Sequence, residues 1–304
     1  AASVSSPLIL DLDGDGVETT GLADGVYFDH DGNGFAQLSG WVAREDGLLV
    51  NDLDGDGQIR SGAELFGNET VLANGNKAAN GFAALRELDG NQDAVIDAVD
   101  AAFARLRVWR DADMDAVADE GELVTLAEAG VASIGLAFAE SSRVDDQGNA
   151  HRQIGQWTRA DGTMAEIADV WFGEDRARTQ NRVGIEVPVA LWSLPDLAGF
   201  GNIPDLHEAM ALDRSGRLAE RVRAFVAEPE EAVRRGIAEE IVMCWAGVDA
   251  IAPGSRGAYV DARALTALEH FSGETFAQFG WGVNPGQTAG KLLMEGFLRI
   301  VSTK

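Results

Sequence analysis

The sequence predicts an α+β protein in which a calcium-loaded module with short strands and hairpins is followed by a mainly α-helical domain. Three observations lead to this expectation. Asp- and Gly-rich loops repeat between short apolar segments through residues 1–172, and polar and apolar residues alternate near the end of that region, as in strands. Residues 173–304 instead place apolar residues three and four positions apart, as in amphipathic helices. We therefore expect two domains, 1–172 and 173–304.

The apolar segments predict the elements of the first domain in chain order. Short buried strands are expected at Leu8–Leu10 and at 48–50, each running into an Asp-rich loop. Helices are expected over 79–88, 101–109 and 123–129. Residues 80–129 would then form paired helix–loop–helix motifs that resemble EF-hands.

Hairpins and then helices are expected after residue 130. Alternating stretches at 133–138 and 151–157 are separated from the next segments by the turn sequences Gly148-Asn149 and Asp161-Gly162. In the second domain, helical spacing of apolar residues is found at 205–212, 217–227, 230–245, 261–271 and 289–301.

The chain is strongly acidic, and the acid is concentrated in the first domain. The 304 residues include 50 Asp and Glu against 24 Lys and Arg, a formal net charge of −26, and residues 1–172 hold 32 of those acids and 10 of those bases. Such a charge repels nucleic acids and anionic membranes, so neither is an expected partner. No apolar stretch is long enough to predict a membrane-spanning segment. The large apolar residues among the acids indicate that this domain is folded, so its clustered carboxylates require cations to neutralise them.

Five segments follow or approximate the pattern D-x-D-x-[DN]-G. Oxygens at positions 1, 3, 5 and 7 of such a loop converge on one point, glycine at position 6 permits the turn, and an acid near position 12 completes the shell. These ligands suit Ca²⁺ better than Mg²⁺, because Mg²⁺ requires a stricter octahedron. We expect roughly three to five Ca²⁺ ions. The expected ligands are Asp11, Asp13, Asp15, Val17 and Glu18; Asp29, Asp31 and Asn33; Asp52, Asp54, Asp56, Gln58 and Glu64; Asp89, Asn91, Asp93, Val95 and Asp100; and Asp111, Asp113, Asp115, Val117 and Glu122.

The last two loops match the pattern most completely. Glu122 stands at position 12 of the loop that begins at Asp111, and Asp100 stands at position 12 of the loop that begins at Asp89. Both loops carry Ala at position 6, which costs stability if that residue has positive φ. We therefore expect both sites to bind with reduced affinity.

The other three loops depart from the pattern at their closing acid. In the loop that begins at Asp52, Glu64 falls at position 13, so this loop is expected to be one residue longer. The first two loops have no acid at position 12. They are expected to complete their shells from each other or from Glu18, as a non-helical pair.

The order of these motifs resembles the calcium-binding module of large RTX-type proteins, which leave bacteria by type I secretion. The resemblance covers about residues 6–172. It rests on Pro7-Leu-Ile-Leu-Asp-Leu-Asp-Gly-Asp-Gly-Val-Glu-Thr-Thr, Phe28-Asp-His-Asp-Gly-Asn-Gly, Trp41, Asp52-Leu-Asp-Gly-Asp-Gly-Gln-Ile and Glu64-Leu-Phe-Gly67. It implies an extracellular protein secreted without an N-terminal signal peptide, with neighbouring domains of a longer parent chain as partners. It also implies a module that is disordered at low calcium and rigid at extracellular calcium.

A related self-processing module occurs in iron-regulated RTX proteins. There, calcium triggers cleavage of the Asp–Pro bond directly before this run, and the new aspartyl end can join a lysine amine. The matching bond here is Ser6–Pro7, and none of the seven prolines follows Asp. Because a serine hydroxyl cannot form the cyclic anhydride of that reaction, we expect a structural module without catalytic residues. Two alternatives remain open: a self-processing module whose Asp is replaced by Ser6, and a hydrolase site or an adhesin surface for cell-surface protein or glycan in the helical half.

Overall fold

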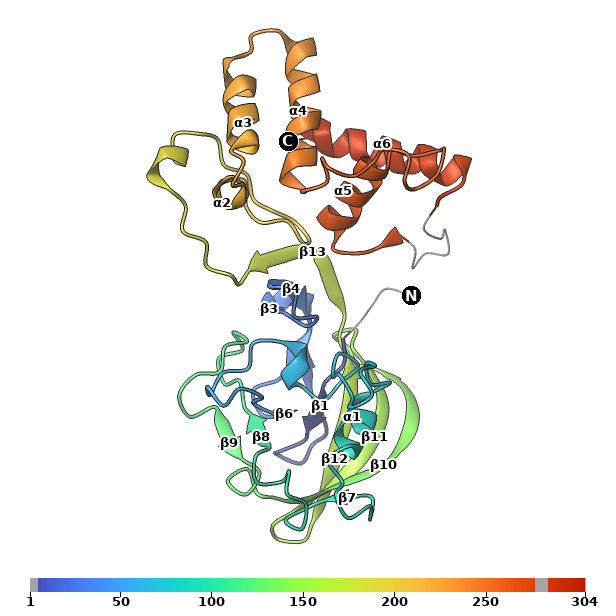
Figure 1. The fold of residues 1–304 in the computed structure, drawn as a ribbon. Coiled ribbons are helices and arrows are strands. Elements are labelled where there is room, and N and C mark those ends of the chain that lie inside the picture. The colour runs from blue at the N-terminus through green and yellow to red at the C-terminus, as the bar shows by residue number, and fades with distance from the viewer. Residues whose placement is uncertain (1–4, 277–283, 304) are drawn as a thin grey trace. The chain divides into compact units, whose positions relative to one another are not determined.

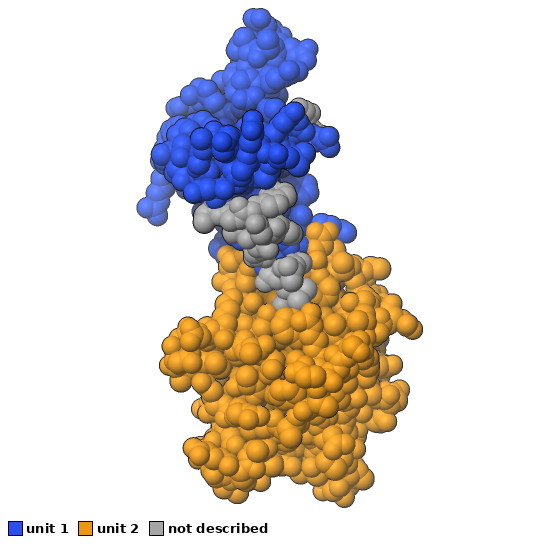
Figure 2. Space-filling view, turned by 90° about the vertical axis from the view of Figure 1, so that its right-hand side faces the viewer, with its two compact units in different colours: residues 1–2, 176–304 blue, residues 3–175 orange. Residues whose placement is uncertain are grey.

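The computed structural model describes residues 5–276 and 284–303. The chain divides into two compact units, which Figure 2 distinguishes by colour. The first unit ends at residue 175 and the second begins at residue 176. Strands dominate the first unit and helices the second (Figure 1). The protein is therefore α+β, as the sequence predicts.

The first unit is built on an eight-stranded antiparallel sheet with the order β7-β10-β11-β12-β1-β6-β8-β9. Figure 1 shows the long strands β10, β11 and β12 curving round this unit. The strands are β1 (Leu8–Leu10), β6 (Gly47–Val50), β7 (Val95–Ile96), β8 (Arg107–Trp109), β9 (Leu123–Thr125), β10 (Val131–Val144), β11 (Ala150–Arg159) and β12 (Met164–Trp171).

The central strand β1 is buried on both faces. Leu8 and Leu10 belong to one apolar cluster, whereas Ile9 belongs to a second cluster on the opposite face. Successive side chains of a strand point to opposite faces, so a strand with a core on each side requires an unbroken apolar run. The expected strands at Leu8–Leu10 and 48–50 are confirmed, and so are the hairpins, whose turns contain Gly148 and Gly162 at positive φ.

Two smaller sheets and a short helix complete this unit. In one of them β3 pairs with β4, and in the other β2 pairs with β5, while β13 begins in the last two residues of this unit and continues into the second. Their bounds are β2 (Thr19–Thr20), β3 (Val26–Phe28), β4 (Phe35–Ser39), β5 (Trp41–Val42) and β13 (Glu174–Asn181), and the helical segments are η1 (Leu22–Asp24), η2 (Gly62–Glu64) and α1 (Gly81–Arg86).

The expected helices at 101–109 and 123–129 are wrong. Their places are taken by β8 and β9, which pair with each other, and β8 also pairs with β6. Val108 enters one core and Trp109 the other, so the short apolar run has the period of a strand. Only α1 precedes an Asp-rich loop, and the paired helix–loop–helix arrangement is not formed in the described part of this unit.

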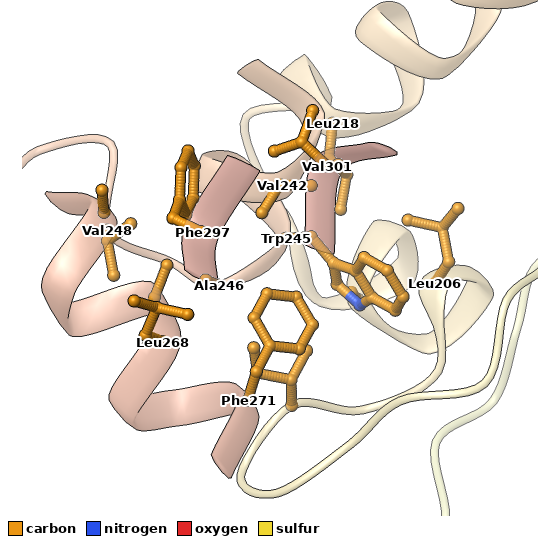
Figure 3. Packing of buried hydrophobic residues seen from close by; sticks show 14 of the residues in the cluster. Leu206, Leu218, Val242, Trp245, Ala246, Val248, Leu268, Phe271, Phe297 and Val301 are labelled. Carbon is orange, nitrogen blue, oxygen red and sulfur yellow. The ribbon is translucent and has the colours of Figure 1, made fainter. Parts of the chain in front are cut away.

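The second unit contains the helices that the sequence predicts, each within two residues of the expected bounds. They are α2 (Leu206–Leu212), α3 (Arg217–Ala227), α4 (Glu231–Trp245), α5 (Ala262–Ser272) and α6 (Gln287–Thr303), with the 3-10 turn η3 (Val189–Leu191) before them. Their apolar faces form one core, in which the Trp245 and Phe271 rings meet edge to face with centroids 5.5 Å apart (Figure 3). None of the described helices combines the length and the apolar character that crossing a membrane requires.

Candidate metal centre

All five Asp-rich loops have the same backbone turn. The fourth and sixth residues of each loop have positive φ, between 58° and 109°. Glycine occupies both positions in the first three loops, but Gln92 and Ala94, and then Met114 and Ala116, occupy them in the last two. The turn is therefore retained even where non-glycine residues must adopt the left-handed conformation, which costs about 1–2 kcal/mol per residue.

Each loop is organised around the carboxylate at its first position. Asp52 Oδ1 accepts a hydrogen bond from the Gly55 N–H at 2.8 Å, and its Oδ2 accepts one from the Gly57 N–H at 2.9 Å. The first Asp of each other loop likewise accepts hydrogen bonds from backbone N–H groups three to five residues ahead, namely Asp11, Asp29, Asp89 and Asp111.

The acids that are expected to close the last three loops lie at the start of those loops. In each case the acid accepts a hydrogen bond from the backbone N–H of the second loop residue. The three bonds run from Leu53 to Glu64 Oε1 at 3.4 Å, from Gly90 to Asp100 Oδ1 at 2.8 Å, and from Ala112 to Glu122 Oε1 at 2.8 Å.

The first loop is closed by Asp46, which the sequence reasoning missed. Asp46 Oδ1 accepts a hydrogen bond from the N–H of Leu12, the second loop residue, at 3.1 Å, and its Oδ2 accepts one from the Glu18 N–H at 2.7 Å. Asp46 is fully buried, and burial raises the pKa of its carboxyl to about 7 against the opposing effect of these N–H groups. Glu18, an expected ligand, is exposed and contributes its N–H to Asp46.

The second loop is closed by a neutral group. Gln37 Oε1 accepts a hydrogen bond from the His30 N–H at 3.1 Å, and its Nε2 donates to Asp31 Oδ1 at 3.3 Å. His30 is buried with its Nε2 2.9 Å from Ser39 Oγ, so its ring is part of the core. An amide N–H directed at a loop carboxylate competes with a cation, which makes this loop the poorest of the five as a metal site.

Carboxylate oxygens converge at three of the loops. In each of four groups of three acids, one oxygen from each acid lies within 4.8 Å of the other two. Converged carboxylates share protons and repel one another: the side-chain hydrogen bond with Asp13, and then the charge of Asp13, raise the pKa of Asp15. An all-oxygen donor set of this charge fits Ca²⁺. The groups are Asp11, Asp13 and Asp15; Asp52, Asp54 and Glu64; Asp111, Asp113 and Glu122; and Asp113, Asp115 and Asp119.

The Asp111 loop is tied to the aromatic core. Trp41 Nε1 donates to Asp111 Oδ2 at 2.7 Å, and Trp109 Nε1 donates to Glu122 Oε2 at 3.3 Å. Both indoles are fully buried, with ring centroids 5.5 Å apart. Burial raises the pKa of Asp111, so the ionised form of this carboxylate requires compensation. A cation at this loop would act on residues that also hold the core together.

A glycine at position 6 of the fourth loop should stabilise it. Ala94 is exposed at φ 66°, and glycine relieves the left-handed strain without removing buried surface. We expect Ala94→Gly to raise the free energy of unfolding by about 1 kcal/mol in urea titrations with calcium present. The matched control is Ala98→Gly, since Ala98 is exposed without positive φ and glycine there should be destabilising. A loss of stability in Ala94→Gly would contradict the prediction.

The Ser6–Pro7 bond, the candidate scission position, is buried at the start of β1. Ser6 is 4% exposed, its N–H donates to Asn68 Oδ1 at 2.9 Å, and the carbonyl of Pro7 accepts from the Val170 N–H at 3.0 Å. A Cβ on Gly67 would lie 1.4 Å from the Ser6 carbonyl oxygen, so only glycine permits this packing. In the Glu64-Leu-Phe-Gly67 sequence, Glu64 therefore closes the Asp52 loop and Gly67 packs against the Ser6 carbonyl.

A buried carboxyl lies beside the same bond. Asp169 on β12 is fully buried, and its carboxylate accepts a hydrogen bond from the Gly81 N–H. Burial raises the pKa of Asp169 to about 7, while the Gly81 N–H and the Ser6 hydroxyl act in the opposite direction. Sequence reasoning missed Asp169, because a lone acid in a strand resembles many other surface acids.

Comparison with known proteins agrees with the resemblance seen in the sequence. The profile of the SPM domain family matches residues 8–173. The chain is similar to the iron-regulated protein FrpA of Neisseria meningitidis serogroup C, with 42% identity over 249 residues. The matched region covers 81% of this chain and 22% of FrpA, so the chain spans about a fifth of the length of that relative.

Proposed function

This chain belongs to the SPM domain family, and from that membership we propose that it is a calcium-dependent folding module of a longer, secreted RTX-type protein. The observation that carries the proposal is the group formed by Asp111, Asp113 and Glu122. Its carboxylates converge, and the outer two are held by core indoles. Filling this group with Ca²⁺ would couple metal binding to packing of the core.

Calcium would control the folding of this unit through charge. At the low calcium concentration inside a cell, the converged carboxylates repel one another and favour an open chain. At millimolar calcium outside, each site at 100 times its Kd adds about 2.7 kcal/mol, so three sites add about 8 kcal/mol. That sum is comparable to the whole stability of a typical domain, about 5–15 kcal/mol.

The closing groups rank the five loops as calcium sites. The loops that begin at Asp52 and Asp111 combine converged carboxylates with a Glu that closes the loop. The Asp11 loop has the same convergence and is closed by Asp46. We place the Asp89 loop below these three because its acids form none of the converged groups found among the described residues, and the Asp29 loop last because a neutral amide closes it.

Removing the closing Glu of the Asp111 loop should remove one calcium ion. Glu122→Ala deletes both oxygens that could bind the ion bidentately and frees the Ala112 N–H. Calorimetric titration should show the loss of about one calcium equivalent. Glu120→Ala is the matched control because Glu120 lies two residues before Glu122 and is exposed, and Glu18→Ala should also keep every site. If Glu18→Ala loses a site and Glu122→Ala does not, the ranking of the loops is wrong.

A second candidate function is self-processing at the bond before Pro7. The burial of Ser6 beside Asp169 favours it, because a carboxyl whose pKa burial raises to about 7 lies next to the bond in question. With serine at position 6, we propose that this chain keeps the frame of such a site without its nucleophile. Neighbouring domains of the parent chain would be its partners in either role.

A further inference from the structure

The helical unit contains an apolar cavity next to its core. The cavity has a volume of about 110 Å³, and every residue that lines it is apolar, including Leu206, Val242, Trp245 and Val301, which lie close together in Figure 3. An apolar cavity of about 150 Å³ can stay dry and bind benzene or xenon. A cavity of this size and lining therefore accepts the last few carbons of a hydrocarbon chain.

A larger hollow continues this cavity along α4. It has a volume of about 510 Å³ and shares Phe225, Ala238 and Val301 with the first cavity. Together the two extend along α4 from Glu231 to Trp245, a helical length of about 20 Å at 1.5 Å per residue. Residues of α3, α4 and α6 line this trough, which is long enough to take a single extended chain.

The trough is apolar at its inner end and charged at its outer end. Arg234 lines the outer part, is half-buried and has no ion-pair partner within the described residues. Arg235 lies 3.9 Å from Glu231, and both of these side chains are more than 70% exposed, so their pairing is weak. Glu239 also lines the outer part. Arginine binds carboxylates through two parallel hydrogen bonds, which makes Arg234 the available partner for an anionic head group.

We propose that this trough binds a single-chain carboxylate amphiphile, a fatty acid of medium chain length. Its carboxylate lies at Arg234, and the end of its chain enters the apolar cavity beside Trp245. The ligand is a free fatty acid, because the acyl chains of a bilayer phospholipid are esters and offer no carboxylate to Arg234. The proposal concerns the helical unit alone and does not depend on calcium binding by the first unit.

Calorimetric titration of the full chain with decanoate below its micellar concentration tests the proposal. We expect binding of one molecule, with octanoate roughly tenfold weaker because each buried CH₂ contributes about 0.8 kcal/mol. Arg234→Gln should weaken decanoate binding roughly tenfold, and Arg223→Gln, an exposed arginine on α3 outside the trough, should leave it unchanged. Equal binding of decylammonium would overturn the assignment of a carboxylate head group.

A second pair of variants tests the trough itself. Ala238→Phe places a ring where the two cavities meet and should abolish decanoate binding, whereas Ala224→Phe makes the same change on the exposed side of α3 and should not. Circular dichroism checks that both variants fold. If Ala238→Phe does not fold, Arg234→Gln still tests the site. Phosphatidylcholine vesicles test the head group, because their acyl chains are esterified. Binding of decanoate without capture of vesicles supports the free acid, whereas vesicle capture that Ala238→Phe removes would contradict the assignment of a carboxylate ligand. Decanoate binding that Ala238→Phe and Arg234→Gln leave intact would overturn the proposal.

Discussion

Chelation of calcium should lower the melting temperature of the 304-residue chain by tens of degrees, or leave residues 1–172 molten. The physical reason is the convergence of carboxylates at the Asp11, Asp52 and Asp111 loops. If three sites together contribute about 8 kcal/mol, and each kcal/mol shifts the melting temperature of a unit of this size by about 2–4 °C, the loss is about 16–32 °C. Scanning calorimetry in excess EGTA against millimolar calcium measures the shift.

Spectroscopy should show which part of the molecule depends on calcium. Near-ultraviolet circular dichroism reports the packing of Trp41 and Trp109, whose indole N–H groups donate to Asp111 and Glu122. We expect this signal to disappear in EGTA while the far-ultraviolet signal of the helical unit remains, and magnesium at the same concentration to restore little of it. A melting curve that EGTA leaves unchanged would contradict the proposed function.

Long periodic segments could be predicted from the sequence, and short ones could not. The helices α3 and α4 have apolar residues at three- and four-residue spacing over more than ten residues, which only a helix satisfies. The strand β8 has three residues, and an apolar run of that length fits a helix as well as a strand between two cores. The error at 101–109 followed from this ambiguity.

The acidic loops could be found in the sequence, but their closing groups could be found only in part. Glu64, Asp100 and Glu122 follow their loops at a nearly fixed spacing, so counting along the chain was enough to locate them. Asp46 and Gln37 replace them in the first two loops at other spacings, and their partners are backbone N–H groups that leave no pattern in the sequence. Hydrogen bonds between these side chains and the loop backbone can be recognised only in the folded structure, where the segments that carry them lie together.

Introducing an aspartate at position 6 should give this chain a calcium-dependent cleavage reaction. Ser6→Asp would place a carboxylate within reach of its own peptide carbonyl, in a chain fused to a folded protein before residue 1. Attack by that carboxylate forms a cyclic anhydride, the bond to the Pro7 nitrogen breaks, and the nitrogen takes up a proton. Water or a lysine amine then opens the anhydride. We expect cleavage between residues 6 and 7 in millimolar calcium and none in EGTA, measured by gel analysis and intact mass.

The parent sequence supplies the first control, because it should remain intact for a day in millimolar calcium. Serine at position 6 offers no anhydride, and the hydroxyl of Ser6 lies in a junction with 4% exposure, where its own N–H is held by Asn68. Scission of the unmodified chain at Ser6–Pro7 would contradict the proposal that this module has a structural role and no cleavage activity. An intact Ser6→Asp chain in calcium would instead indicate that the frame around this bond no longer places a carboxylate against the carbonyl.

The neighbouring carboxyl decides how the introduced aspartate would behave. Burial raises the pKa of Asp169 to about 7, so Asp169 holds a proton over much of the range in which an ordinary aspartate is ionised. Two adjacent carboxyls share protons, and the more buried one keeps its proton while the other ionises. Asp169 would then donate a proton to the departing proline nitrogen, while the introduced carboxylate attacks.

Ser6→Asp combined with Asp169→Asn should fold, because an amide oxygen can still accept from the Gly81 N–H, but should cleave at least about tenfold more slowly. Equal rates with and without Asp169 would exclude it as the proton donor, and a rate that rises with pH well above 7 would exclude any donor of its pKa.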